Sequence, residues 1–342
     1  MDGVTSNSAE QRVLHSSAEG EILVAPARDG KRTLTVKPNS PSSFISRRQI
    51  TTSYPDDLIL CILEAKGLSD VCDEIARDED PCYVSVALQT DLFAFVPPEY
   101  FAGKRVLDFG CGSGASTMVL HRLVKGAEIY GVELDKRLIR VAKARALYYG
   151  FPPDHLVTSP DAQTLPTELG SFDVVVLSAV WEHLLPVERP IVMRQIWSLL
   201  RQGGIFFLNQ TPNRYCPMEV HTTGLPIINY LPDRLALLAA RRFSSCVKPD
   251  ERWESLLRRG IRGGTREEVL KLITNTCNGK VSLFAPVRSE GAKDLIDLWY
   301  KVSSEARLRA LKRCIWFILK GLKFVTGAQL VPSLTLAVQK EA

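Results

Sequence analysis

Hydrophobic positions alternate between strand-like and helix-like patterns from residue 104 to residue 212. Short apolar runs predict strands at 105–109, 128–133, 172–178 and 205–209, and amphipathic stretches predict helices at 115–123, 136–149 and 188–200. The run at 172–178 is almost continuously apolar, which is typical of a parallel strand covered on both faces. This alternation predicts an α/β fold, with a Rossmann-like, doubly wound, mostly parallel sheet and helices on both sides.

The segments before this core have different patterns. Residues 1–48 are rich in Ser, Gly, Pro and scattered charge, and they predict a disordered tail that cannot offset its ordering entropy. Residues 49–103 carry apolar side chains at mixed helical spacing and predict a helical N-terminal cap. The core itself therefore spans residues 104–212.

The segments after the core also differ from it. Residues 213–279 contain Pro, Arg and aromatic residues without clean periodicity, which predicts a lid or substrate insertion. Within it, Thr265 and Glu268 form a capping box at the start of a helix. Residues 280–342 predict two strands joined by a long amphipathic helix, and we expect these strands to close the sheet edge as an antiparallel pair.

The long C-terminal helix, expected at 307–324, has an apolar stripe that we expect to face the core. The stripe consists of Leu308, Leu311, Ile315, Ile318, Leu319 and Leu322. Trp316, Phe317 and Phe324 fall off this stripe, among Lys and Arg residues and with no acid from 307 to 323. Two interpretations stay open: a neighbouring segment covers these aromatics, or they make peripheral contact with an anionic membrane surface or a lipid-bearing substrate.

Composition narrows the class of protein. The 342 residues are 45% hydrophobic and 24% charged, with no membrane-spanning run and no signal-peptide pattern, so we expect a cytoplasmic globular protein, at most membrane-associated. Eight scattered cysteines without a Cys-x-x-Cys pair favour a reducing compartment over a zinc site or disulfide framework. The net charge of +5 does not require nucleic acid as a partner. Residues 241–266 contain eight basic and three acidic side chains, which fits either an anionic ligand or a solvated helical face.

A glycine-rich loop joins the first core strand to the first core helix. Gly110, Gly112 and Gly114 let the backbone turn tightly and let an anionic group approach the helix N-terminus. The same residues satisfy a permissive dinucleotide fingerprint, with Glu133 about 20 residues beyond. The glycines alone therefore leave the choice of nucleotide-like cofactor open.

Four ordered features narrow that choice. Asp108 lies two residues before the glycines, Glu133 ends the second strand, Asp161-Ala162 precedes Leu165-Pro166, and Trp181-Glu182-His183-Leu184 follows the strand at 172–178. Together they resemble the class I S-adenosylmethionine-dependent methyltransferases, in particular the small-molecule O-methyltransferases of quinone biosynthesis. The resemblance covers about residues 100–212.

This resemblance implies S-adenosyl-L-methionine as the cofactor and a contact for each part of it. Its methionine ammonium would meet Asp108 and the Gly110 backbone, and its carboxylate the amides near Gly112 and Gly114. Glu133 would accept from both ribose hydroxyls. The adenine would pack on Leu134 and meet Asp161 and the Ala162 backbone. Cys111 lies in the same loop, where we assign it no redox role.

Methyl transfer to a hydroxyl also needs a base, and neutral histidine is suited to that role. His183, after the strand at 172–178, and His221, after the strand at 205–209, are the two candidates. A metal site formed by Glu182, His183, Glu219 and His221 is the alternative. Metal-using relatives carry a further Glu three residues before the Glu-His pair, where this chain has Ala179, so we expect no metal.

The sequence therefore predicts methyl transfer to a hydroxyl of a small or lipid-linked acceptor, such as a saccharide or a quinone-like molecule, which could be anionic. An S-adenosylmethionine-binding protein without catalysis and an NAD-dependent oxidoreductase are the alternatives. Asp108, Asp161 and the Glu-His segment have no role in the oxidoreductase. The acceptor atom and the oligomeric state stay open.

Overall fold

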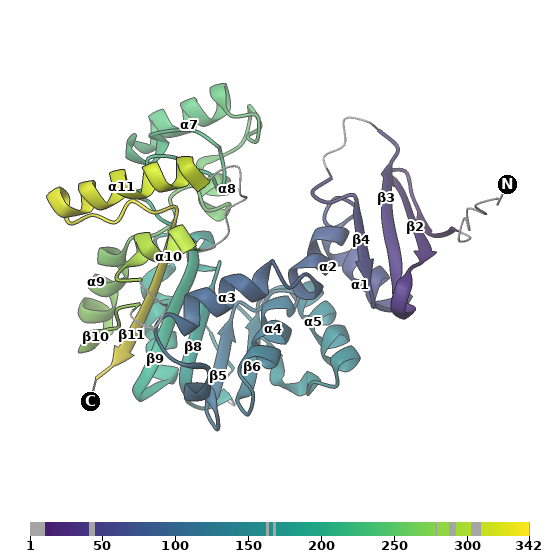
Figure 1. Cartoon of the computed structure of the whole chain (residues 1–342), viewed down its shortest axis with the longest axis horizontal. Helices are drawn as coiled ribbons and strands as arrows, with labels where there is room; N and C mark the ends of the chain where they lie inside the picture. Colours follow the sequence, from purple (N-terminus) through teal and green to yellow (C-terminus); the bar gives the residue numbers. More distant parts are fainter. Residues whose placement is uncertain are drawn as a thin grey trace.

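The main sheet of the protein contains both parallel and antiparallel strands (Figure 1). The structure is a computed structural model that describes residues 11–40, 45–161, 164–166, 169–277, 279–286, 292–301 and 309–341. Within these residues the main sheet has seven strands in the order β10-β11-β9-β8-β5-β6-β7. Their bounds are β5 (Arg105–Phe109), β6 (Glu128–Glu133), β7 (Leu156–Thr158), β8 (Phe172–Ser178), β9 (Leu200–Pro212), β10 (Val281–Leu283) and β11 (Ser333–Lys340).

Strands β5 to β9 pair in parallel, whereas β11 pairs antiparallel with both β9 and β10. The predicted fold class is thereby confirmed, including the closing antiparallel pair. Two details differ from the expectation. The three-residue strand β7 is too short to give a periodic signal, and β9 begins at Leu200 because Gly203 and Gly204 lie within the strand rather than before it.

Strand β8 shows why the sequence at 172–178 is almost continuously apolar. Val174 and Val176 pack into the core on one face of the sheet, with α4 (Ala115–Leu123) and α5 (Lys136–Tyr149). Val175 and Leu177 pack into the core on the other face, with α6 (Arg189–Leu199) and α9 (Arg266–Cys277). Because side chains alternate across a strand, burial on both faces requires every position to be apolar.

The expectation of a disordered tail at 1–48 is wrong for the described part of that segment. A four-stranded antiparallel sheet forms there in the order β1-β2-β3-β4. Its strands are β1 (Arg12–Ser16), β2 (Gly20–Pro26), β3 (Arg32–Pro38) and β4 (Gln49–Thr52). Ile22 and Val24 on β2 and Leu34 and Val36 on β3 are buried together. Apolar residues at every second position stabilise a sheet only when the strands pair and a layer of helices covers one face. The composition of the segment alone does not reveal these contacts.

That covering layer is the helical N-terminal cap. It consists of α1 (Asp56–Lys66), α2 (Val71–Glu79) and α3 (Val84–Phe93). Helices α1 and α2 supply apolar side chains such as Ile59 and Ile75 to the core under the small sheet. They also pack on α5 and α4 of the main domain, and Figure 1 shows them between the two sheets. The cap thus brings α2 close to the glycine loop.

The segment 213–279 forms a lid with a small core of its own. Its helices are α7 (Asp233–Phe243), α8 (Trp253–Arg258) and α9, and Ile228, Ala236 and Leu256 are buried in its core. The predicted cap at Thr265 is confirmed, because its hydroxyl accepts from the Glu268 backbone N–H at 3.1 Å. The Glu268 side chain forms a salt bridge with Arg189 instead of completing the box.

The C-terminal helix α11 (Arg309–Thr326) packs with the opposite face from the one predicted. Leu311, Ile315, Ile318 and Leu322 are exposed, and of the predicted stripe only Leu319 is buried, while Leu308 lies outside the described residues. The inward face instead carries Trp316, Lys320 and Lys323, which contact Asp294 and Asp297. These carboxylates, at the start of α10 (Leu295–Lys301), decide the orientation of the helix.

Candidate active site

A cavity of about 680 Å³ opens at the carboxyl ends of β5, β6 and β8. This is where ligands bind in open parallel α/β sheets. Its wall contains most of the predicted site residues: Gly110, Cys111, Gly112, Glu133, Leu134, Asp161, His183 and His221. Asp108 and Gly114 do not line it, and Ala162 lies outside the described residues.

The glycine loop has the conformation that requires glycine. Gly110, Gly112 and Gly114 have φ values of 76°, 55° and 79°, a region that L side chains rarely adopt. Space is also limiting, because a Cβ on Gly110 would lie 2.6 Å from Val180 and one on Gly114 would lie 2.8 Å from Ala142. The loop therefore brings backbone amides close to the cavity at the start of α4.

A buried ion pair from the N-terminal cap holds this loop. The Arg145 guanidinium, on α5, donates to Glu74 Oε1 at 2.9 Å and to the Ser113 carbonyl oxygen at 2.8 Å. Burial by itself raises the pKa of Glu74, but Arg145 and Lys66 outweigh it and lower the pKa to about 2. Glu74, Lys66 and Arg77 also line the cavity. No sequence motif marked these residues, because they lie far from the loop in the chain.

Glu133 also holds the glycine loop in place, through a hydrogen bond from the Gly112 backbone N–H. Its carboxylate accepts from the backbone N–H groups of Gly112 at 2.9 Å, Leu134 at 2.6 Å and Asp135 at 3.0 Å. Asp135 caps α5 as predicted, since its side chain accepts from the Arg137 N–H at 2.8 Å. Glu133 thus lies in the cavity wall at the end of β6, where a ribose acceptor is expected.

Asp108 lies behind the loop rather than in the cavity wall. Its carboxylate accepts from the hydroxyls of Ser116 at 2.8 Å and Thr117 at 2.7 Å, both on α4. Burial raises the pKa of Asp108 to about 6, although these hydroxyls favour the charged form. Its position indicates that it ties β5 to α4. Burial also raises the pKa of the Cys111 thiol well above its usual value, which makes this thiol a poor nucleophile.

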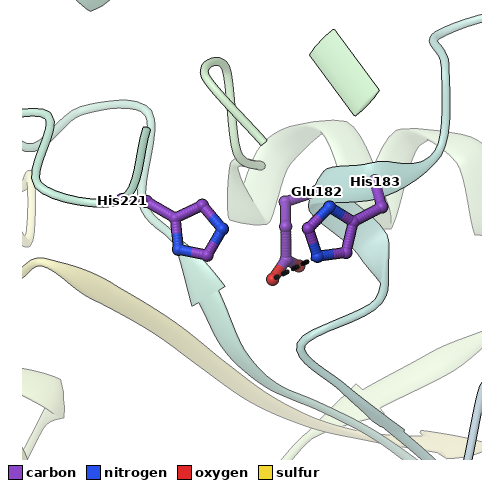
Figure 2. Close-up of side chains that lie close together, drawn as sticks. All are labelled: Glu182, His183 and His221. Carbon is purple, nitrogen blue, oxygen red and sulfur yellow. Dashed lines mark ion pairs between the residues drawn. The ribbon is translucent and has the colours of Figure 1, made fainter. Parts of the chain in front are cut away.

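Two histidines and a buried glutamate meet at the opposite wall. Figure 2 shows Glu182 and His183 from the 3₁₀ turn η5 (Trp181–His183) facing His221 from the lid. The imidazole centroids are 5.8 Å apart, and His183 Nε2 lies 3.9 Å from Glu182 Oε1. One ligand atom from each of the three residues lies within 4.8 Å of the others. The trio could therefore hold a metal ion or act as a proton-accepting group.

The remaining polar contacts fix the orientation of each ring. His183 Nδ1 lies 2.7 Å from the carbonyl oxygen of Arg258, so in the neutral ring Nδ1 carries the proton and Nε2 is free to accept one. Burial, followed by the nearby His183, lowers the pKa of His221, which keeps its ring neutral at pH 7. Glu219 does not join the trio, because its carboxylate accepts from the backbone N–H groups of His221, Thr222 and Thr223. It holds the loop that carries His221.

Backbone strain marks two further residues in the cavity wall. Ala179 follows β8 with a φ of 54°, and Gln210, near the end of β9, has a φ of 57°. Positive φ at residues other than glycine costs energy and is concentrated at ligand sites. Gln210 belongs to no motif and is identified by its backbone conformation alone, whereas Ala179 is also the position where metal-using relatives carry Glu.

Three arginines of the basic cluster in the lid form ion pairs within the protein. Arg258 forms a bidentate ion pair with Glu188, with both contacts at 2.6 Å. Arg259 pairs with Glu251 and Arg262 pairs with Asp233. Arg258 still lines the cavity, but Glu188 lies beside it. These three arginines therefore help to hold the lid together.

Residues 107–208, which contain the glycine loop, Glu133 and His183, match the family model described as "Methyltransferase domain". The predicted resemblance is confirmed. The chain is 40% identical over 117 residues to the ubiquinone biosynthesis O-methyltransferase of Nitrosococcus oceani, covering 33% of this chain and 48% of that protein. It is 32% identical over 168 residues to the protein of the same name from Roseobacter denitrificans, covering 48% of this chain and 62% of the relative.

The match thus spans less than two thirds of either relative. Among solved structures, an S-adenosylmethionine-dependent methyltransferase from Clostridium acetobutylicum is 18% identical with a TM-score of 0.35, covering 48% of this chain and 62% of that one.

Proposed function

We propose that the protein transfers a methyl group from S-adenosyl-L-methionine to a hydroxyl of a small or lipid-linked acceptor, a saccharide or a quinone-like molecule. One observation carries the proposal. A single cavity contains both the Glu133 and glycine-loop wall and the His183–His221 wall. The names of the curated relatives, ubiquinone biosynthesis O-methyltransferases, support a hydroxyl on a quinone-like acceptor.

The first wall is suited to the cofactor. Glu133 lies at the end of β6, where its carboxylate can accept from two ribose hydroxyls. The amides of the glycine loop precede α4, whose N-terminus favours a carboxylate. Leu134 is half exposed in the cavity wall and offers an apolar surface for an adenine ring. When bound, the cofactor supplies a methyl group on a sulfonium, and the cavity positions the acceptor against it.

The second wall is suited to removing the hydroxyl proton. His183 offers Nε2 as the acceptor, because its Nδ1 proton points at the Arg258 carbonyl. After proton transfer the imidazolium would lie 3.9 Å from Glu182, which is buried against Thr211. A nearby carboxylate stabilises that charge. His221, neutral and directly opposite, would orient the acceptor or take the proton itself.

Calorimetric titration separates the function classes before any acceptor is known. We expect S-adenosylmethionine and its demethylated product to bind and NAD not to bind. Binding of NAD alone would favour the oxidoreductase. Tight S-adenosylmethionine binding without transfer of a labelled methyl group to quinol, catechol or saccharide acceptors would favour a binding protein without catalysis.

Substitution of the histidines tests the catalytic wall. We expect the variant of the true base, His183→Gln or His221→Gln, to lower turnover about 10²- to 10⁴-fold while S-adenosylmethionine affinity is unchanged. His155→Gln is the matched control, because His155 contacts the Ile129 carbonyl and Tyr130 and does not line the cavity. Parent turnover in both test variants would place the base elsewhere.

The free thiols of the protein bear on the compartment that we propose for it. All eight cysteines are free thiols in the described structure, which supports a reducing, cytoplasmic compartment. Within the described residues, no helix combines the length and apolarity needed to cross a bilayer. An anionic acceptor would meet Arg258 only beside its Glu188 partner.

A further inference from the structure

The end of α8, in the lid, contacts both segments that carry the candidate histidines. The Arg258 carbonyl oxygen accepts from His183 Nδ1 at 2.7 Å. The next carbonyl oxygen, that of Arg259, accepts from the hydroxyl of Thr222 at 2.9 Å, and Thr222 directly follows His221 in the chain. The last carbonyl groups of a helix have no partner within that helix, so they are available for such contacts. A shift of this end of α8 would therefore move the contacts of both histidine segments.

An ion pair connects this end of α8 to the core of the protein. The Arg258 guanidinium donates to both carboxylate oxygens of Glu188 at 2.6 Å, and its Nη1 lies 3.3 Å from the His183 carbonyl oxygen. Glu188, just before α6, also accepts from the Leu185 backbone N–H at 2.9 Å. A bidentate pair of this kind fixes orientation as well as distance. Arg258 therefore contacts His183 twice, with its backbone at the ring and with its side chain at the main chain.

We propose that Arg258 is a positioning residue for methyl transfer, because its ion pair with Glu188 keeps α8 against η5 and so orients His183 Nε2 towards the acceptor. The inference rests on the proposed function and adds a residue outside the histidine pair shown in Figure 2. A carbonyl oxygen only accepts hydrogen bonds, so it favours the neutral ring that carries its proton on Nδ1 and leaves Nε2 free. Small displacements of a reacting group lower the rate strongly.

The exposure of the ion pair separates positioning from stabilisation of the fold. The side chains of Arg258 and Glu188 are 45% and 15% exposed, and ion pairs that are this accessible to water contribute little to stability. Arg201 and Asp173 form a matched pair, 44% and 22% exposed, with contacts at 3.0 and 3.1 Å. Arg201 lies at the start of β9, at the opposite end of this strand from the cavity. Loss of that pair therefore tests stability alone.

Turnover of substituted proteins tests the role of the ion pair. Glu188 is not among the described residues that line the cavity, so Glu188→Gln acts through Arg258. We expect Glu188→Gln and Arg258→Gln each to lower kcat about tenfold, with unchanged affinity for S-adenosylmethionine. The double variant should be no slower than either single variant, because both substitutions remove the same ion pair. Arg201→Gln should keep the parent rate. Parent turnover in both single variants would overturn the inference.

Nitrogen-15 spectra of the histidine rings test the orientation without any acceptor. The His183 signals are assigned by their loss in His183→Gln, and the pH is kept high enough for a neutral ring. We expect Nδ1 to carry the proton in the parent and both neutral forms to be populated in Glu188→Gln. Arg258→Lys, which retains one charged contact, should give an intermediate spectrum and replaces Glu188→Gln if that variant does not fold. Unchanged His183 signals would overturn the inference.

Failure of the proposed function would give a different result. The parent would then transfer no methyl group to any acceptor, while the ring spectra of the parent and Glu188→Gln would still differ.

Discussion

Replacing Arg145 with Met removes the guanidinium that joins the N-terminal cap to the glycine loop. Arg145 is fully buried and donates to Glu74 at 2.9 Å, to Ser113 at 2.8 Å and to the Tyr54 hydroxyl at 3.0 Å. Methionine fills the same space but leaves the buried Glu74 carboxylate with Lys66, at 3.4 Å, as its one salt-bridge partner among the described residues. Removing one partner of a buried ion pair costs about 3–5 kcal/mol.

The pKa of Glu74 shows how the stability that its ionised carboxylate provides depends on pH. Although burial raises it, Arg145 and Lys66 lower this pKa from the ordinary value of 4.5 to about 2. Because the pKa is lower in the folded state, the stabilisation is complete above about pH 4.5 and is lost as the pH falls towards 2. A shift of this size corresponds to about 3 kcal/mol of stabilisation of the ionised carboxylate by all of its surroundings together, with Lys66 and the cost of burial included.

Urea denaturation monitored by circular dichroism, at pH 7 and in a series down to pH 3, measures both effects. We expect Arg145→Met to lower the free energy of unfolding by about 3–5 kcal/mol at pH 7. We also expect it to lose less stability than the parent between pH 4.5 and 3.

Arg140→Met is the matched control on the same helix. Arg140 pairs with Glu64 through side chains that are 55% and 65% exposed, so its loss should cost less than about 1 kcal/mol. The reasoning is refuted if the free energy of unfolding of Arg145→Met lies within about 1 kcal/mol of the parent's. Arg145 would then contribute no more than an exposed surface ion pair does.

Three further substitutions or treatments test the site. Glu133→Ala should weaken binding of S-adenosylmethionine by about 2–3 kcal/mol, measured by calorimetry, and parent affinity would contradict the ribose assignment. Gly260 has a φ of 96° and packs against His221, where an added Cβ would lie 2.8 Å from Cδ2, so Gly260→Ala should lower turnover about tenfold or more. Gly224→Ala, at a φ of 70° with open space around it, is the control, and equal turnover in the two would show that this contact does not position His221. Dialysis against EDTA should leave turnover unchanged, whereas a loss restored by Mg²⁺ or Zn²⁺ would assign Glu182, His183 and His221 to a metal.

The main sheet and the cofactor wall could be predicted from the sequence because their signals are local. The apolar runs of β5, β6 and β8 have one stable environment, a strand covered on both faces. The glycines after β5 adopt backbone angles that other residues rarely reach. Glu133 follows from its place at the end of the next strand. Each of these inferences needs only a short stretch of chain.

Local sequence pattern did not predict the elements whose burial depends on contacts with distant segments of the chain. The small N-terminal sheet has a period-2 pattern in β2 and β3, but those side chains are buried only because four strands pair and α1 and α2 cover them. The stripe of α11 was expected inside because it is apolar. Instead, Lys320 and Trp316 face inward because they contact Asp294 and Asp297. Such contacts between separate segments produce no periodic pattern in the sequence.

For the candidate catalytic wall too, the sequence predicted some features and only the tertiary structure revealed the others. His183 and His221 are identifiable singly, since each follows the carboxyl end of a core strand. Their approach to within 5.8 Å, and the free Nε2 of His183, depend on the Arg258 carbonyl from α8 and on the loop that Glu219 holds. Likewise, Arg145 and Glu74 lie 71 positions apart in the chain and meet only when the cap packs on α5. The sequence determined which chemical groups are present at the strand ends, whereas packing between distant segments decided which of them face each other, because burial and hydrogen-bond geometry depend on neighbours that no local pattern contains.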